Sequence, residues 1–168
     1  MSDKFHLDID NSAHAAALGR LVAHWAVLER HLILILQWLL STDWKTAMII
    51  YQEFVSTKSK IVLLRRLNNY RNKNKTLKKE IDSYLAHALN LNSERNTFIH
   101  ALWSTQVKDH IVRIKTIPPF DHKKIEHPWE QLAYQDIQDV VEEISKLSGS
   151  LHNLIYRIHG VPPEQPKE

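Results

Sequence analysis

The chain has 168 residues and a formal net charge of +3, a length that suits one substantial hydrophobic core and falls short of several domains. It contains no cysteine, which excludes disulfides, thiolate metal sites and cysteine nucleophiles. Because sheet proteins need many turn glycines, three glycines and 43% hydrophobic residues favour long helices. We therefore expect an all-α helical bundle of about five helices.

Residues 1–11 form a predicted N-terminal extension that lacks the basic and apolar regions of a signal peptide. Apolar residues then recur at intervals of three and four, which predicts a first helix over 12–41. Its most apolar run, 32–40, is interrupted by Gln37 and is too short to cross a bilayer. We expect no membrane association and a cytoplasmic location.

One acidic residue, Glu29, lies inside the apolar stripe of this first helix. The stripe is formed by Leu18, Leu21, Val22, Trp25, Leu28, Leu32, Ile33, Leu36, Leu39 and Leu40. A carboxylate on a core-facing surface needs a partner, so it indicates an ion pair, an interface or a functional site. We expect Glu29 to pair with Arg95, and both a structural ion pair and one that organises a site remain open.

Two shorter helices are predicted over 44–55 and 58–70. A basic segment, residues 58–79, covers the second of them and the start of the next helix. It holds no acidic residue and nine basic ones, namely Lys58, Lys60, Arg65, Arg66, Arg71, Lys73, Lys75, Lys78 and Lys79. Such a segment is typical of an RNA-binding surface, while a solvated helix face explains it equally well.

The next predicted helix, 76–103 with Thr76 as its N-cap, carries the groups most suited to a phosphodiester. Arg95, Asn96 and His100 lie within one and a half turns. A guanidinium clamps phosphate oxygens, an imidazole exchanges a proton near neutral pH, and an amide orients either the ligand or the histidine. The apolar stripe of this helix, extended to Ile99 and Leu102, passes on or beside Arg95. A solvated helix face is the simpler alternative.

The segment after this helix is rich in Val, Ile and Thr, which predicts a short β-hairpin near 104–117. Two prolines then open a predicted surface loop that runs to Trp129. A last helix is predicted over 132–159, and Gly160 followed by Val-Pro-Pro ends it. Residues 12–160 are thus expected to form a single domain, followed by a disordered tail over 161–168.

The chain has eleven histidines, but none belongs to a His-Glu-x-x-His arrangement. His24 and His31 share a helix face and are best explained as flanks of the core stripe. Glycine loops that cradle phosphate and a glycine-flanked serine nucleophile are also absent from the sequence. We expect no metal site and no cofactor.

Late in the long helix, Arg95-Asn96 is followed after three residues by His100 and then by Ala-Leu-Trp. This pattern resembles the signature of the HEPN family (higher eukaryotes and prokaryotes nucleotide-binding domains). The resemblance covers roughly 12–160 and includes an early helix with an acidic residue. It implies a helical bundle that dimerises, with metal-independent ribonuclease activity in many members and RNA or nucleotide binding without cleavage in others. Members paired with a nucleotidyltransferase antitoxin often carry Tyr two positions after the His, where this chain has Leu102, so a tyrosine-modification switch is not expected.

In the ribonuclease interpretation, an RNA 2′-hydroxyl attacks its own phosphorus, so no metal is needed. His100 would act as acid or base, Arg95 would stabilise charge on phosphoryl oxygens, Asn96 would orient the phosphate or the imidazole, and Glu29 would hold Arg95. The expected partners are RNA and a second copy in a homodimer, with a neutralising protein also open. A non-catalytic RNA- or nucleotide-binding module and a structural helical dimerisation protein are the alternatives. Toxin, immunity and housekeeping roles are not distinguished.

Overall fold

The computed structural model describes residues 12–100, 102–107, 110–114, 129–132 and 134–160, with the backbone alone described between 102 and 132. The predicted N-terminal extension, the loop predicted after the hairpin and the predicted tail therefore lie outside the described residues, apart from Trp129.

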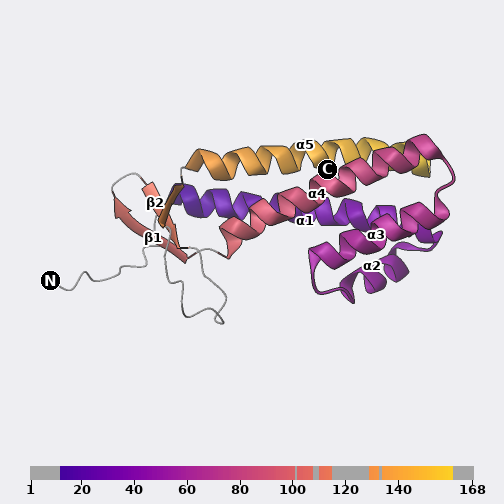
Figure 1. Ribbon diagram of the computed structural model, residues 1–168, viewed down its shortest axis with the longest axis horizontal. Coiled ribbons are helices and arrows are strands. Elements are labelled where there is room, and N and C mark those ends of the chain that lie inside the picture. Colours follow the sequence, from indigo (N-terminus) through magenta and orange to yellow (C-terminus); the bar gives the residue numbers. More distant parts are fainter. Residues whose placement is uncertain (1–11, 101, 108–109, 115–128, 133, 161–168) are drawn as a thin grey trace, which may run out of the picture. The chain divides into compact units, whose positions relative to one another are not determined.

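Five helices account for most of the described residues (Figure 1). They are α1 (Ser12–Leu40), α2 (Trp44–Gln52), α3 (Thr57–Arg71), α4 (Lys75–Ile99) and α5 (Tyr134–His159). The predicted helical fold with about five helices is confirmed for this part of the chain. Helix α2 ends earlier than predicted, and α5 begins two residues later.

Three short strands lie between α4 and α5: β1 (Leu102–Val107), β2 (His110–Ile114) and β3 (Trp129–Leu132). They form an antiparallel sheet in the order β1-β2-β3. Strands β1 and β2 occupy the segment where the sequence predicted a hairpin. Trp129, which the sequence predicted at the end of the surface loop, is instead the first residue of β3 and pairs with Ile114.

Helix α4 is shorter than predicted, and both of its ends differ from the expectation. Asn74 is the capping residue in place of Thr76, because its Oδ1 accepts the backbone N–H groups of Thr76 and Leu77, each at 3.1 Å. At the other end the helix stops at Ile99, and Leu102 already pairs with Ile114 in the sheet. Strand pairing therefore prevails over the helical periodicity that suggested an extension to residue 103.

Helix α1 ends in a Schellman motif that has no glycine. The N–H of Thr42 donates to the carbonyl of Gln37 at 3.2 Å, and the N–H of Ser41 donates to that of Trp38 at 3.1 Å. Ser41 takes the left-handed conformation, with φ of 54°. By contrast, α5 ends as predicted at Gly160, which has φ of 66° and donates to the carbonyl of Tyr156.

The chain divides into two compact units, each assembled from separate segments. Unit 1 comprises the described residues of 1–23 and 93–142, and unit 2 those of 24–92 and 143–168. Helices α1, α4 and α5 each contribute residues to both units. The basic segment belongs to unit 2, and Arg95, Asn96 and His100 belong to unit 1.

Each unit has its own buried apolar side chains. Those of unit 1 are Ala17, Leu21, Phe98, Ile137, Val140 and Val141. In unit 2, all five helices contribute, with fully buried leucines and isoleucines such as Leu28, Leu32, Ile61, Leu64, Ile81, Leu85, Ile144 and Leu151. Burial of this kind supplies most of the stabilisation that fixes short helices such as α2 and α3.

The predicted core stripes are mostly confirmed, with errors at single positions. Val22, predicted to be buried, is 48% exposed, whereas Ile35 is fully buried. In α4 the buried residue near the end is Phe98, and Ile99 is only partly buried. Each error is one helical position, about 100° around the axis, which a three-and-four pattern alone does not resolve.

Candidate functional site

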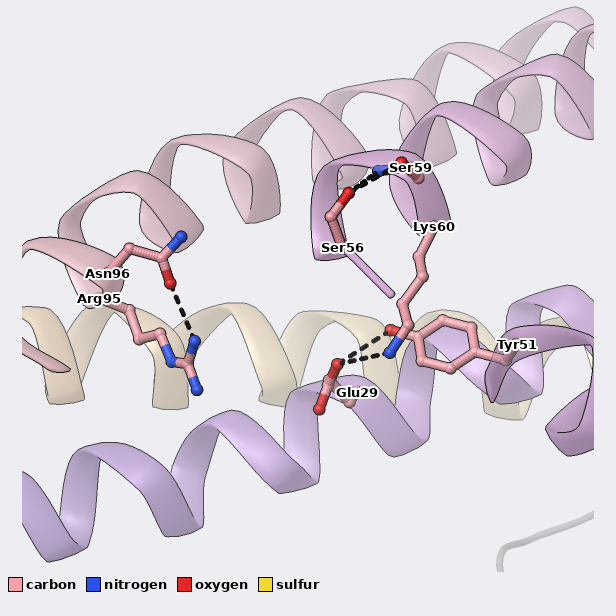
Figure 2. A network of polar contacts seen from close by, with 7 residues as sticks. All are labelled: Glu29, Tyr51, Ser56, Ser59, Lys60, Arg95 and Asn96. Carbon is pink, nitrogen blue, oxygen red and sulfur yellow. Dashed lines mark hydrogen bonds and ion pairs between the residues drawn. The ribbon is translucent and has the colours of Figure 1, made fainter. Parts of the chain in front are cut away.

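The last turn of α4, in unit 1, holds Arg95 and Asn96 in direct contact. Arg95 Nη1 donates a hydrogen bond of 2.9 Å to Asn96 Oδ1 (Figure 2). Arg95 is half-buried and lies on the same helix face as buried Leu91 and Phe98, which confirms that the apolar stripe passes through it. The hydrogen bond orients the guanidinium, so a planar donor group is held in place at the end of this helix.

His100 follows the last residue of α4 and has an exposed side chain. Its backbone N–H donates to the carbonyl oxygen of Asn96 at 3.1 Å. Asn96 therefore contacts both other members of the cluster, Arg95 through its side chain and His100 through its main chain. A fixed cation, an amide and an accessible imidazole form a local set that suits a phosphate ester.

Glu29 has partners that the sequence did not predict. It lies in unit 2, where its Oε1 is 3.4 Å from Lys60 Nζ and accepts the hydroxyl of Tyr51 at 3.5 Å (Figure 2). Lys60 Nζ also lies 4.3 Å from the centroid of the Tyr51 ring, a cation–π contact. Burial, followed by the Glu29 charge and hydrogen bond, raises the pKa of Tyr51. The cluster joins α1, α2 and α3, and the expected pairing of Glu29 with Arg95 stays a prediction.

The nine basic residues of the basic segment differ in what they contact. Seven are exposed, namely Lys58, Arg65, Arg66, Arg71, Lys73, Lys75 and Lys79. Lys60 is largely buried against Glu29 and Tyr51, and Lys78 Nζ donates to the carbonyl of Asn69 at 3.2 Å. Lys60 and Lys78 therefore have structural contacts within the fold, whereas the seven exposed cations are accessible to a polyanion.

A buried amide, which no sequence pattern indicated, fixes the two helices of the basic segment to each other. Asn68 is fully buried, and its Nδ2 donates to the carbonyl of Lys78 at 2.9 Å and to Asp82 Oδ1 at 3.1 Å. Its Oδ1 accepts from Asn72 Nδ2 at 3.0 Å. The Asn68 hydrogen bonds thereby fix the two helices that carry most of the exposed cations relative to each other.

Among the described residues, no three His, Asp or Glu side chains gather as a metal-binding group. His31 and His152 do lie together in unit 2, with ring centroids 5.9 Å apart in an edge-to-face arrangement. His24, predicted to share a face with His31, has no part in this pair. Across the same residues, no single helix is long and apolar enough to cross a membrane.

The chain matches no family model, and no curated protein or solved structure matches it significantly. The resemblance to the HEPN family accordingly rests on the Arg95-Asn96 and His100 pattern and on its helical setting.

Proposed function

We propose that this protein is a metal-independent endoribonuclease of HEPN type, with Arg95, Asn96 and His100 as the reactive cluster. The observation that carries the proposal is the Arg95–Asn96 hydrogen bond near the end of α4, with the exposed residue His100 directly after the helix. Three groups with complementary roles toward a phosphodiester are held within six residues. The exposed cations of the basic segment supply a second, independent reason to expect a polyanionic substrate.

The proposed reaction uses only the substrate and these side chains. The RNA 2′-oxygen attacks the adjacent phosphorus, the 5′-oxygen leaves, and a 2′,3′-cyclic phosphate and a 5′-hydroxyl remain. His100 transfers a proton to or from one of these oxygens, and Arg95 stabilises the charge that develops on the phosphoryl oxygens. Asn96, through its contact with Arg95, positions the guanidinium.

The test is incubation of the purified full-length protein with mixed-sequence RNA in EDTA. We expect cleavage that leaves cyclic phosphate ends, and a loss of about 100-fold or more in rate for His100→Ala. His152→Ala removes an exposed histidine outside the cluster and serves as the matched control. An RNA with a 2′-deoxyribose at the scissile position should stay intact.

Two results would contradict the proposal. Cleavage of the 2′-deoxy substrate would exclude the 2′-oxygen as nucleophile. Activity that disappears in EDTA and returns with a divalent ion would require a metal-dependent mechanism.

A non-catalytic RNA-binding protein is the second candidate, and the seven exposed basic residues of the basic segment favour it independently of the cluster. It predicts RNA binding that weakens steeply with salt, together with intact RNA in every incubation. Binding and cleavage assays on the same preparation therefore separate the two candidates.

A further inference from the structure

The outer face of α3 carries a surface hollow of about 420 Å³ that the Arg95 cluster does not use. It is lined by Phe54, Lys58, Ser59, Val62, Leu63 and Arg66. Its walls are therefore apolar and aromatic, and two exposed cations stand at its border. The volume lies within the range of small-molecule binding sites, roughly 300–1,000 Å³.

An exposed aromatic residue continues the same face. Ser59, Leu63 and Arg66 follow one another at helical spacing, and Tyr70 is the next member of that row, one turn beyond Arg66. The Tyr70 side chain is 87% exposed. Arg66, one turn before Tyr70, and Arg71, the next residue after it, are exposed as well. Aromatic surface and positive charge thus alternate along α3.

We propose that this face of α3 binds single-stranded RNA, with one nucleobase in the hollow and a neighbouring base stacked on Tyr70. Lys58 and Arg66 bind the phosphates on either side of the inserted base. Stacking platforms interleaved with cations are the arrangement that proteins use for single strands, because every base has an apolar face and every linkage has a charge. An acidic peptide would use the cations and leave the hollow and the exposed ring without a role. The choice of RNA rests on the proposed function, but the binding surface does not depend on catalysis.

The test measures fluorescence anisotropy of a labelled 2′-O-methyl oligonucleotide, which lacks the 2′-hydroxyl and so separates binding from cleavage. Tyr70→Ala should weaken binding about tenfold, the effect of one lost base stack. Tyr156→Ala, at a half-exposed tyrosine of α5, is the matched control and should change little.

Filling the hollow gives an independent variant. Val62 is only partly buried and lines the hollow, so Val62→Trp places an indole in it without touching the core. Val27→Trp, at a half-exposed valine of α1, controls for the added ring. Both variants must keep the thermal unfolding transition of the wild type. Val62→Trp should weaken oligonucleotide binding about tenfold more than Val27→Trp.

An abasic oligonucleotide of equal length and charge separates base recognition from charge attraction. Tyr70→Ala and Val62→Trp should leave its affinity unchanged, whereas the double variant Lys58→Gln, Arg66→Gln should weaken both ligands. Arg30→Gln, Lys45→Gln removes two exposed cations outside α3 as a control.

Equal affinity for the abasic and the base-bearing ligand would overturn the proposal, and so would equal effects of the test and control variants. Competition by polyglutamate as strong as by RNA would assign the face to an acidic protein partner instead. Base-dependent binding by a protein that never cleaves RNA would remove the ribonuclease function and keep this surface. RNA cleavage that is unaffected by Tyr70→Ala and Val62→Trp would support the ribonuclease function and reject this binding surface.

Discussion

At the scale of single residues, the His31 side chain shows how packing alters an ionisable group. His31 belongs to α1, and its ring packs against His152 of α5 within unit 2. Its Nδ1 is buried and has no hydrogen-bond partner. Burial, and then the nearby charges of His152 and Arg30, lowers the pKa of His31 to about 4. The neutral imidazole is therefore the form that the fold accommodates.

The lowered pKa of His31 predicts that the folded state loses stability as the pH falls. In the unfolded chain His31 titrates near its ordinary pKa of about 6.5, so between pH 6.5 and 4 the unfolded state binds the extra proton. The stability of the fold is therefore unaffected by His31 above pH 6.5. As the pH falls from 6.5 to 4, protonation of His31 in the unfolded state lowers the free energy of unfolding, by about 1–3 kcal/mol in total. Urea unfolding at pH 4.5 and 7.5 measures it.

His31→Phe keeps a ring beside His152 and removes the titration, so its stability should fall less than that of the wild type between the two pH values. His24→Phe, on the same helix, should retain the wild-type dependence. If His31→Phe and the wild type lose equal stability, the acid sensitivity belongs to other groups.

At the scale of elements, one buried amide joins α3 to α4 in addition to the buried apolar side chains of both helices. Helix α3 has few buried residues, Ile61, Leu64 and Asn68, and two of its faces carry exposed charge. Asn68 joins α3 to the first two turns of α4 through hydrogen bonds to Lys78 and Asp82. Ser56 caps the start of α3 by accepting the N–H of Ser59 at 3.1 Å.

Loss of this amide should cost about 1–3 kcal/mol, because Asn68→Ala leaves the carbonyl of Lys78 and the side chains of Asp82 and Asn72 without their buried partner. Asn69→Ala, at the exposed neighbouring position, is the matched control and should change the free energy of unfolding by no more than about 0.5 kcal/mol. Chemical denaturation of both variants and the wild type measures the two changes in the free energy of unfolding. Equal stability of both variants would show that the Asn68 network is not a tie between the helices.

At the scale of the whole molecule, the proposed chemistry points to a homodimer. Transesterification of RNA benefits from both an acid and a base, and the cluster at the end of α4 contributes one histidine, His100. A twofold axis near this segment would bring a second Arg95 and a second His100 to the same groove. The resemblance to the HEPN family implies the same arrangement.

Light scattering at micromolar concentration should therefore report about twice the chain mass of 19.7 kDa. Mixing wild-type chains with an excess of His100→Ala chains should lower the activity per wild-type chain, because each mixed dimer keeps only one of the two histidines. A strictly monomeric protein that cleaves RNA would refute the shared site. A dimer whose interface excludes residues 91–103 would do so as well.

The sequence by itself determined the helical composition of this protein and most of its core. Repeats of apolar residues at threes and fours located the five helices and buried residues such as Leu28, Ile81 and Ile144, because helical periodicity is a local property of the chain. The glycine at 160 marked the end of α5 for the same reason. The Arg95–Asn96 contact was also within reach of the sequence, since adjacent residues need no distant segment to meet.

Only the tertiary structure decided which distant groups meet. Nothing near Glu29 in the sequence indicates Lys60 and Tyr51 as its partners, and nothing near Asn68 indicates that it is buried between two helices. Helix α4 stops at Ile99 because Leu102 finds a strand partner twelve residues away, which outweighs its local helical pattern. The hollow beside Val62 likewise exists only because Phe54 packs near α3. Local patterns determine the helices, and long-range packing determines which distant side chains come into contact.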